Sequence, residues 1–561
     1  MSTYLKVILL FVVFSFTEQG FTQNQPCSNP LAAADLAANN ARARLLTGGD
    51  LWWDGSDGRY IVPGQNILEE RAVIFSGGLW IAGNTVDGEL RLAAQEYGRS
   101  SGDFDFYTGP LSLNQAATDS ESCDAWDKFF GLEASMVNDF ITDYELDGQI
   151  DGGIIQEILE WPGAGNEYYE NFPGFSGLFD GSVSAPFFDR NDNGVYEPES
   201  GDYPIAKGDE QFWWVYNDAG NVHRNTGGEP LGMEIRANAF AYSFMDEPLD
   251  LTTFYEYEMI YKNSEPLSDF YFTLWVDVDL GCFTDDYVGC APDENLAYVY
   301  NADNFDDLNC PFNVPAYGTD IPNVAFKTLL AETSEGEEIP FSSFTYTVGG
   351  NPNSPIGEAT TESGRYNLMT GRWRGGTPLT LGGNGFQTSS QMASHAFDGS
   401  ETGNGPWIEC NTNNPGGDRR LMMNYGPVDL MQGDKISFCF AVIALLDQPH
   451  PCPSVANMIE AANEIEDFYG GIVNSTRESQ TVERLIEVFP TPAVDQYINF
   501  SAPDQIDDLI LYDLSGRIIL RYEGMANDTI RLDTSTLPAG VYSFKAILGN
   551  GQIGTGKLIK N

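Results

Sequence analysis

The clearest candidate for chemistry is a loop-forming segment, DRNDNGVYEPESGDYP, at residues 189–204. Side-chain oxygens alternate along it and precede a glycine, as in calcium loops, where the glycine permits the sharp turn that lets the oxygens converge. A serine stands at the twelfth position, where an EF-hand has a bidentate glutamate, so the pattern is closer to the short Asp/Asn-Gly calcium loops of extracellular β-proteins. Asx turns without a metal are the alternative. The expected ligands are Asp189, Asn191, Asn193 and the carbonyl of Val195, completed by Glu197, Glu199 or Asp202.

A second acidic segment, WVDVDLGCFTDDYVGC, follows a strand-like run and contains Asp277, Asp279, Asp285 and Asp286. Adjacent carboxylates at the end of a strand repel one another unless a cation lies between them. The segment therefore predicts a second calcium site. A third group, at residues 143–151, equally suits a solvated series of turns. Calcium at these places would brace loops in a strongly negative protein, so we expect a structural ion rather than a catalytic one.

Two tryptophan pairs beside acidic residues are the candidate ligand contacts. They are Trp52 and Trp53, and Trp213 and Trp214. Exposed aromatic rings next to two suitably spaced carboxylates would suit the binding or hydrolysis of a polysaccharide. However, among 82 acidic residues such neighbours arise by chance, and aromatic pairs in strands are usually part of a core.

The sequence contains no established catalytic signature. It has no HExxH helix and no phosphate-binding GxxxxGK[ST] loop. The histidines, His223, His395 and His450, are scattered, which argues against a histidine-based metal centre while leaving a single general base available. These observations favour binding over catalysis. A secreted polysaccharide-degrading hydrolase is the alternative.

The eight cysteines suit disulfide bonds in an oxidising compartment. Cys282 and Cys290 flank a short acidic loop, and Cys439 and Cys452 bracket a strand end and a proline-rich turn. We expect these two pairs to be bonded, and the sequence leaves the remaining connectivity open.

Apolar runs separated by glycine and proline predict a mostly β fold built from β-sandwich layers. The most distinct runs are residues 72–81, 210–216, 254–261, 270–278 and 436–445. One amphipathic helix is predicted at residues 455–469, after the start signal Pro453-Ser454, and it should pack on the last sheet before the C-terminal region. We expect a signal peptide at 1–22, an N-terminal β-rich region at 23–161, a central β-sandwich with the acidic loops at 185–310, a third β-rich region ending in the helix at 323–475, a linker at 476–487 and a C-terminal domain at 488–561.

The C-terminal domain carries three ordered motifs in six short strand-like runs, the pattern of a small Ig-like β-sandwich. It resembles the type A sorting domain of Bacteroidota proteins exported by the type IX secretion system. The resemblance implies as partners the secretion machinery and its sortase, with the remaining chain released or anchored to surface lipopolysaccharide. Phe489 and Thr491 depart from the family's usual Tyr and Asn. The matching residues include Pro490 and Pro492 in FPTPA, Asp513 and Gly516 in LYDLSGRII, Gly540 and Tyr542 in LPAGVYSF, and Lys557 in GKLIKN.

The N-terminal region has the form of a cleaved signal peptide. One basic residue, Lys6, precedes the apolar run 7–16, and small residues at Gly20 and Thr22 suit cleavage before residue 23. The apolar run is too short to cross a bilayer, which needs about 20 residues. No other stretch is long and apolar enough, so we expect no transmembrane span in the mature chain. The segments at residues 48–63, 74–83, 106–111, 366–386 and 418–434 also resemble those of a group of large secreted Bacteroidota proteins that have no established activity.

The net charge of -54 lies almost entirely before residue 488. A surface this negative repels nucleic acid and anionic lipid and attracts divalent cations, so we expect no nucleic-acid partner. The sequence thus predicts a calcium-stabilised protein of the cell surface or the surrounding medium. Its expected work is adhesion, envelope structure or the capture of a glycan.

Overall fold

The computed structural model describes residues 26–560, apart from 65–69, 114, 244–246, 403–404, 447, 478–485, 490–496, 514–517, 523–526, 536, 539 and 549–552. The predicted signal peptide and most of the predicted linker lie outside the described residues.

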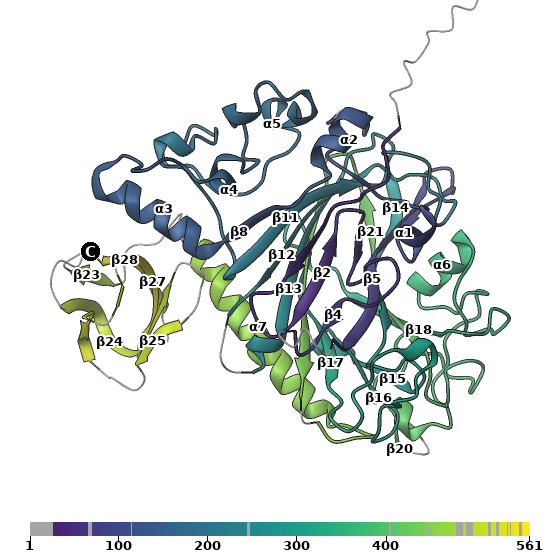
Figure 1. The fold of residues 1–561 in the computed structure, drawn as a ribbon. Helices are drawn as coiled ribbons and strands as arrows, with labels where there is room; N and C mark the ends of the chain where they lie inside the picture. Colours follow the sequence, from purple (N-terminus) through teal and green to yellow (C-terminus); the bar gives the residue numbers. More distant parts are fainter. Residues whose placement is uncertain are drawn as a thin grey trace, which may run out of the picture.

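The first of two large antiparallel sheets is assembled from strands that are distant in sequence (Figure 1). Strands β4 (Tyr60–Ile61) and β6 (Leu90–Ala94) pair with β5 at its side. The main order is β1 (Ala33–Leu36), β2 (Arg42–Leu46), β3 (Asp50–Leu51), β5 (Ala72–Thr85), β14 (Leu267–Val278), β21 (Arg419–Leu430) and β18 (Phe341–Val348).

The second sheet faces the first and is built in the same way. Strand β8 (Phe130–Glu133) pairs with β11 at one edge. The main order is β15 (Asp286–Ala291), β16 (Leu296–Asn301), β17 (Asn323–Thr333), β22 (Lys435–Leu445), β13 (Thr252–Tyr261), β12 (Met233–Ala241), β11 (Glu210–Asn217) and β7 (Tyr107–Thr108). Two short ladders pair β9 (Phe187–Phe188) with β10 (Tyr203–Pro204), and β19 (Glu401–Thr402) with β20 (Gly405–Pro406).

Strand β22 shows why its sequence reads as an uninterrupted apolar run. Phe438 and Phe440 point into the core between the two sheets, whereas Cys439 and Ala441 point to the opposite face. Successive side chains of a strand alternate between faces, so a strand covered on both sides needs apolar residues at every position. Helix α7 (Val455–Arg477) supplies the second cover.

Helix α7 confirms the predicted amphipathic helix and extends it by two turns. Met458, Ala462 and Ile465 are fully buried, at the spacing of one helix face. Figure 1 shows the helix lying across the outer face of the second sheet. The remaining helices are α1 (Gly98–Ser101), α2 (Ser120–Trp126), α3 (Ala134–Asp147), α4 (Gln156–Leu159), α5 (Gly177–Asp180) and α6 (Glu362–Met369).

The division of residues 23–475 into three β-rich regions is wrong. Strands from all three segments alternate within the same two sheets, so one sandwich spans the whole region. Residues 162–184, which separate the first two predicted regions, are also not a linker, because Phe175, Leu178 and Val183 are buried in a core with α2, α3 and β11. Glycine and proline there mark tight turns inside a packed insert rather than a boundary.

The C-terminal domain consists of antiparallel strands around its own apolar core, as predicted. The strand-like runs at residues 497–500 and 509–513 merge into one long strand, with a register shift between Ser501 and Ile506. The strands are β23 (Glu487–Phe489), β24 (Tyr497–Asp513), β25 (Ile518–Tyr522), β26 (Asn527–Asp533), β27 (Gly540–Leu548) and β28 (Ile553–Lys560).

Candidate functional site

A cavity of about 730 Å³ lies at one end of the first sheet, where β14 ends and β21 begins. Asp277 and Arg420 are direct partners across these two strands, and Asp279 and Asp418 lie just beyond the paired segment. We call this space the acidic cavity. Its charged lining residues are Asp57, Arg59, Glu70, Asp277, Asp279, Asp418 and Arg420.

The floor of the acidic cavity is a hydrogen-bonded network. Tyr97 donates from its hydroxyl to Asp277 Oδ2 at 2.7 Å, and Arg420 Nε donates to the same hydroxyl at 3.0 Å. Arg420 also forms ion pairs with Asp418 and with Glu358, the latter at 2.9 Å. Asp277 Oδ1 lies 3.1 Å from Arg420 Nε yet accepts no hydrogen bond. The guanidinium therefore supplies the positive charge that these carboxylates need.

Three carboxylates of this cavity converge: one oxygen each from Asp277, Asp279 and Asp418 lies within 4.8 Å of the others. Burial raises the pKa of Asp277 to about 7, against the opposing effect of Arg420. Burial, followed by the charges of Asp277 and Asp418, raises the pKa of Asp279 well above its usual range. Perturbed carboxyl groups in a cavity are typical of ligand-binding and catalytic sites.

Aromatic side chains form the other wall of the acidic cavity. Phe75, Phe283 and Phe312 line it, and Phe312 is 90% exposed. The Phe312 backbone is left-handed, with φ of 61°, and its ring stacks with that of Phe283 at 6.4 Å between centroids. A bulky residue in this conformation is uncommon, and such strain is concentrated at binding sites.

The four carboxylates predicted as one calcium site divide between two places. Asp277 and Asp279 belong to the acidic cavity, whereas Asp285 and Asp286 lie near Asp306, at the start of β15. Burial, then the charge of Asp306, raises the pKa of Asp285 to about 7, and burial raises that of Asp306 to about 6. Burial also raises the pKa of Asp286 well above its usual range. The two groups are therefore separate candidate cation sites.

The predicted loop at 189–204 is closed by its own hydrogen bonds. Asp189 accepts from the amides of Asn191 and Gly194, and Asp202 accepts from those of Arg190 and Glu197. Asn193 accepts from the amide of Val195 at 2.7 Å, and both asparagine side chains donate to Glu197. The segment forms the Asx turns that the sequence allowed, and calcium binding there stays a prediction.

The tryptophan pairs do not form a ligand surface, which corrects the sequence-based expectation. Trp52, Trp53, Trp213 and Trp214 are each at most 4% exposed. The indole of Trp52 donates to the Tyr255 hydroxyl at 2.8 Å between the sheets, and Trp214 packs there as well. Trp213 lies in a separate core with buried side chains from the helical insert, residues 120–206. Phe312 of the acidic cavity, by contrast, is exposed beside carboxylates.

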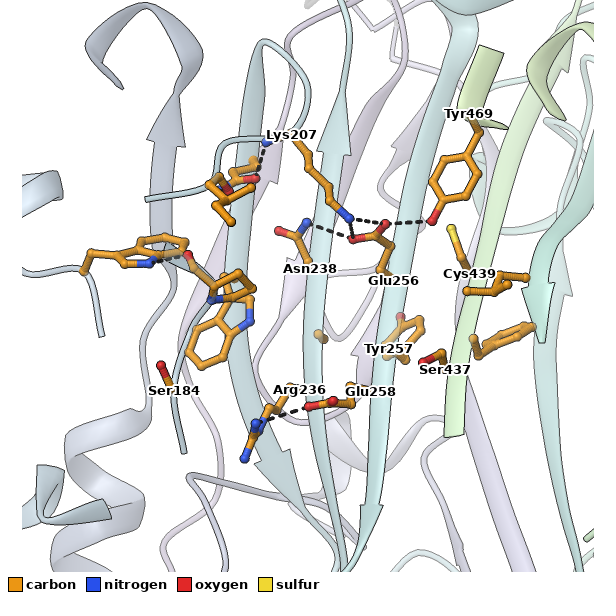
Figure 2. Close-up of a pocket in the computed structure, with 18 residues that line it drawn as sticks. Ser184, Lys207, Arg236, Asn238, Glu256, Tyr257, Glu258, Ser437, Cys439 and Tyr469 are labelled. Atoms are coloured by element: carbon orange, nitrogen blue, oxygen red, sulfur yellow. Dashed lines mark hydrogen bonds and ion pairs between the residues drawn. The ribbon is translucent and has the colours of Figure 1, made fainter. Parts of the chain in front are cut away.

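A second cavity, of about 390 Å³, lies between the second sheet, α7 and the insert (Figure 2). Its charged groups are already paired: Lys207 contacts Glu256 at 2.6 Å, and Arg236 contacts Glu258 at 3.1 Å. Tyr469 of α7 donates to Glu256 at 2.9 Å, as Figure 2 shows. This cavity therefore offers fewer uncommitted polar groups than the acidic cavity does.

The two predicted disulfide pairs are wrong. Cys290 and Cys439 are free and buried within β15 and β22, where strand pairing holds them away from the loop cysteines. The Cys290 thiol donates to the carbonyl of Ala396 at 3.3 Å, and burial raises the pKa of both thiols well above the usual range. The bonded pairs are Cys27–Cys123, Cys282–Cys310 and Cys410–Cys452.

The C-terminal region indicates the localisation of the protein. Residues 487–561 match the family of the secretion system C-terminal sorting domain. Asp513 lies in β24, Gly540 and Tyr542 lie in β27, and Lys557 lies in β28, whereas Pro490, Pro492 and Gly516 are outside the described residues. The protein is therefore a secreted or cell-surface protein, and its sorting domain implies an interaction with the type IX secretion machinery.

Other comparisons give only faint likenesses. No curated protein matches the chain. CopC from Methylosinus trichosporium OB3b has a TM-score of 0.12 and 15% identity, covering 14% of this chain and 91% of that protein. A polysaccharide lyase has a TM-score of 0.17 and 8% identity, and the matched region spans 58% of this chain and 34% of the lyase. Scores this low carry no conclusion about activity.

Helix α7, the longest in the described residues, is amphipathic rather than uniformly apolar. Within that part of the chain, no helix combines the length and hydropathy needed to cross a membrane.

Proposed function

We propose that this secreted or cell-surface protein binds a neutral glycan in the acidic cavity and that calcium stabilises its loops. The observation that carries the proposal is the pairing of an exposed, left-handed Phe312 with three convergent carboxylates in one cavity. Sugar rings offer an apolar face for stacking and hydroxyls that donate to carboxylates. Pockets that combine aromatic walls with a few fixed polar groups are the usual form of small-ligand sites.

The charge of the acidic cavity selects among glycans. Five carboxylates line it, against the two cations Arg59 and Arg420. Arg420 is already committed to its neighbours, so an anionic sugar would meet uncompensated negative charge. Neutral sugars are therefore the expected ligands, and uronic-acid polymers should bind poorly.

The test is a panel of neutral and anionic glycans applied to the full-length secreted protein and to Phe312→Ala. We expect the variant to bind neutral glycans about fivefold to tenfold more weakly, the effect of losing one aromatic contact of about 1 kcal/mol. Phe172→Ala is the matched control, because Phe172 is 48% exposed and does not line the acidic cavity. Equal binding by wild type and Phe312→Ala would rule out this ligand site.

A second candidate function is glycoside hydrolysis, supported by the Asp277–Asp279 pair. One oxygen of each carboxyl lies within 4.8 Å of the other, an upper bound that is compatible with the short separation in retaining glycosidases, roughly 5–5.5 Å, rather than the wider one in inverting enzymes. Asp279, whose pKa is raised well above its usual range, would be the acid, and Asp277, held by Tyr97 and Arg420, the nucleophile. Release of reducing ends that disappears in Asp279→Asn would favour this function, whereas bound glycan that stays intact would favour binding alone.

The sorting domain supports a proposal about maturation as well. We infer that the sortase of the secretion system removes residues 488–561 and that the remaining chain is either released or joined to surface lipopolysaccharide. Mass spectrometry of the protein from medium and from washed cells distinguishes these fates, because lipopolysaccharide adds a heterogeneous mass. Recovery of only the uncleaved chain would contradict the proposal.

A further inference from the structure

The start of the β15–β16 strand pair holds buried oxygen atoms that accept no hydrogen bond within the described part of the chain. They are Oδ1 of Asp285, Oδ1 of Asp286 and Oδ1 of Asn301. Asp286 and Asn301 are 0% exposed, so bulk water does not reach them. Nearly all buried polar atoms in proteins have a partner, and several exceptions in one place indicate a missing one.

Strand pairing brings these oxygens to one spot. Asp286 and Asn301 are direct partners across β15 and β16, a relationship that places their Cβ atoms about 4.5–5.5 Å apart. The Asn301 side-chain amide donates to Oδ2 of Asp285 at 3.3 Å. Asn301 thus donates to Asp285, lies opposite Asp286 in the strand register and presents its own oxygen without a donor.

Asp306 adds a third carboxylate from the following loop. One of its oxygens lies within 4.8 Å of one from Asp285. The short turn before β15 ties Asp286 and Asp306 together, because Leu280 donates its amide to Asp286 at 3.3 Å and Cys282 donates to Asp306 at 2.9 Å. The Cys282 sulfur is bonded to Cys310, so it is not available as a thiolate ligand.

The arginine side chains near this group already interact with other residues. Arg419 interacts with Asp286 but forms its ion pair with Glu409 at 2.9 Å. The Arg71 guanidinium, which also acts on Asp306, lies over the ring of Tyr317 at 5.7 Å from its centroid. Buried water would satisfy the oxygens by donating hydrogen bonds, yet it would leave three carboxylates without a counter-charge. A divalent cation would meet both needs.

We propose that Asp285, Asp286, Asn301 and Asp306 bind a resident calcium ion. All the donors are oxygens, which excludes the nitrogen and sulfur sets preferred by zinc and copper. Calcium accepts irregular sets of carboxylate and amide oxygens, whereas magnesium demands near-ideal octahedral geometry. This inference specifies the calcium part of the proposed function and does not depend on the glycan.

The ion would brace the aromatic wall of the acidic cavity. Asp306 lies in the loop after β16, which continues through Cys310 to Phe312, and the disulfide Cys282–Cys310 joins that loop to the turn after β14. A cation between Asp306 and the β15–β16 pair would fix the other side of the loop. Calcium should therefore order the segment that carries Phe312.

The test compares calcium binding by the full-length protein and two variants, using titration calorimetry after removal of divalent ions. Asp286→Asn removes one ligand charge and should lower the stoichiometry by one or weaken that site at least tenfold. Asp307→Asn is the matched control, because Asp307 is the exposed neighbour of Asp306, and it should bind as wild type does. Identical binding by a folded Asp286→Asn protein would overturn the assignment.

Hydrogen exchange of the wild-type protein gives a second readout, which does not rely on a variant that folds. Amides in residues 280–318 should exchange at least tenfold more slowly in calcium than in chelator. No change, or protection by magnesium alone, would overturn the calcium site. Calcium protection without glycan binding would support the calcium site and refute the glycan proposal. Glycan binding without calcium protection would support the glycan proposal and refute the calcium site.

Discussion

The hydroxyl of Tyr97 donates a 2.7 Å hydrogen bond to Asp277, and these two residues come from segments 180 positions apart. Arg420, from a third segment, donates to the same hydroxyl at 3.0 Å. The floor of the acidic cavity therefore exists only when β14 and β21 are paired and the turn before α1 is packed against them. Loss of this hydrogen-bonded network would therefore indicate that the packing of the first sheet has changed.

Replacing Tyr97 by Phe should destabilise the protein by about 1.5–3 kcal/mol, because it removes the buried hydrogen bond that the Tyr97 hydroxyl donates to the Asp277 carboxylate. Tyr60→Phe is a matched control. The Tyr60 hydroxyl contacts the neutral Thr253 hydroxyl at 2.8 Å, so its loss should cost about 0.5–1.5 kcal/mol. Urea unfolding of both variants measures the difference. Equal losses would show that the Asp277 charge is not carried by this network.

Removing calcium with a chelator should lower the melting temperature of the full-length protein, because uncompensated carboxylates then repel one another. Asp189→Ala should remove part of this sensitivity if the loop at 189–204 binds an ion. Asp192→Asn tests the same loop at an exposed residue that is not an expected ligand, and it should respond to chelator as wild type does. Melting that is indifferent to chelator would refute calcium stabilisation.

Breaking the Glu409–Arg419 ion pair should be far more costly than breaking an exposed pair. The two side chains are 0% and 1% exposed and lie 2.9 Å apart. Glu409→Gln leaves the buried Arg419 guanidinium without its ion-pair partner, a change that costs about 3–5 kcal/mol. Asp35→Asn removes the partner of Arg44 at the surface and should cost less than about 1 kcal/mol. Chemical denaturation measures both, and similar losses would contradict the burial argument.

The strand pattern could be predicted from the sequence because alternation and apolar runs are local signals. The runs at 254–261 and 436–445 became β13 and β22 almost residue for residue. Helix α3 was missed, although Val137, Phe140 and Ile141 have the spacing of a buried helix face. The division into domains failed because glycine and proline mark turns within a packed insert as readily as linkers between domains.

The site could be predicted only in part. Asp277 and Asp279 stood out because a single residue separates them in the sequence. Calcium at either acidic group stays a prediction. Asp418, Arg420 and Tyr97 gave no such signal, since only the pairing of β14 with β21 brings them to Asp277. The Cys282–Cys310 disulfide could not be predicted either, because no local sequence pattern indicates the path of the loop that brings Cys310 to Cys282.

His395 should make stability fall in mild acid. Its Nε2 lies 3.0 Å from the carbonyl of Phe341 and its Nδ1 lies 2.8 Å from the Ser394 hydroxyl. The neutral ring satisfies both contacts by donating from Nε2 and accepting at Nδ1. Burial lowers the pKa of His395 below its ordinary value of 6.5, so below that pH the unfolded chain binds more protons than the folded one.

The His395 contribution to stability is thus fully present above about pH 6.5 and is lost as the pH falls, by at most about 1.4 kcal/mol per pH unit. The free energy of unfolding, measured from pH 8 to pH 5, should decline less steeply in His395→Gln than in wild type, because glutamine does not titrate. Other groups titrate in both proteins, so the difference between the two curves isolates the histidine. Parallel curves would mean that the ring is equally charged in the folded and unfolded states.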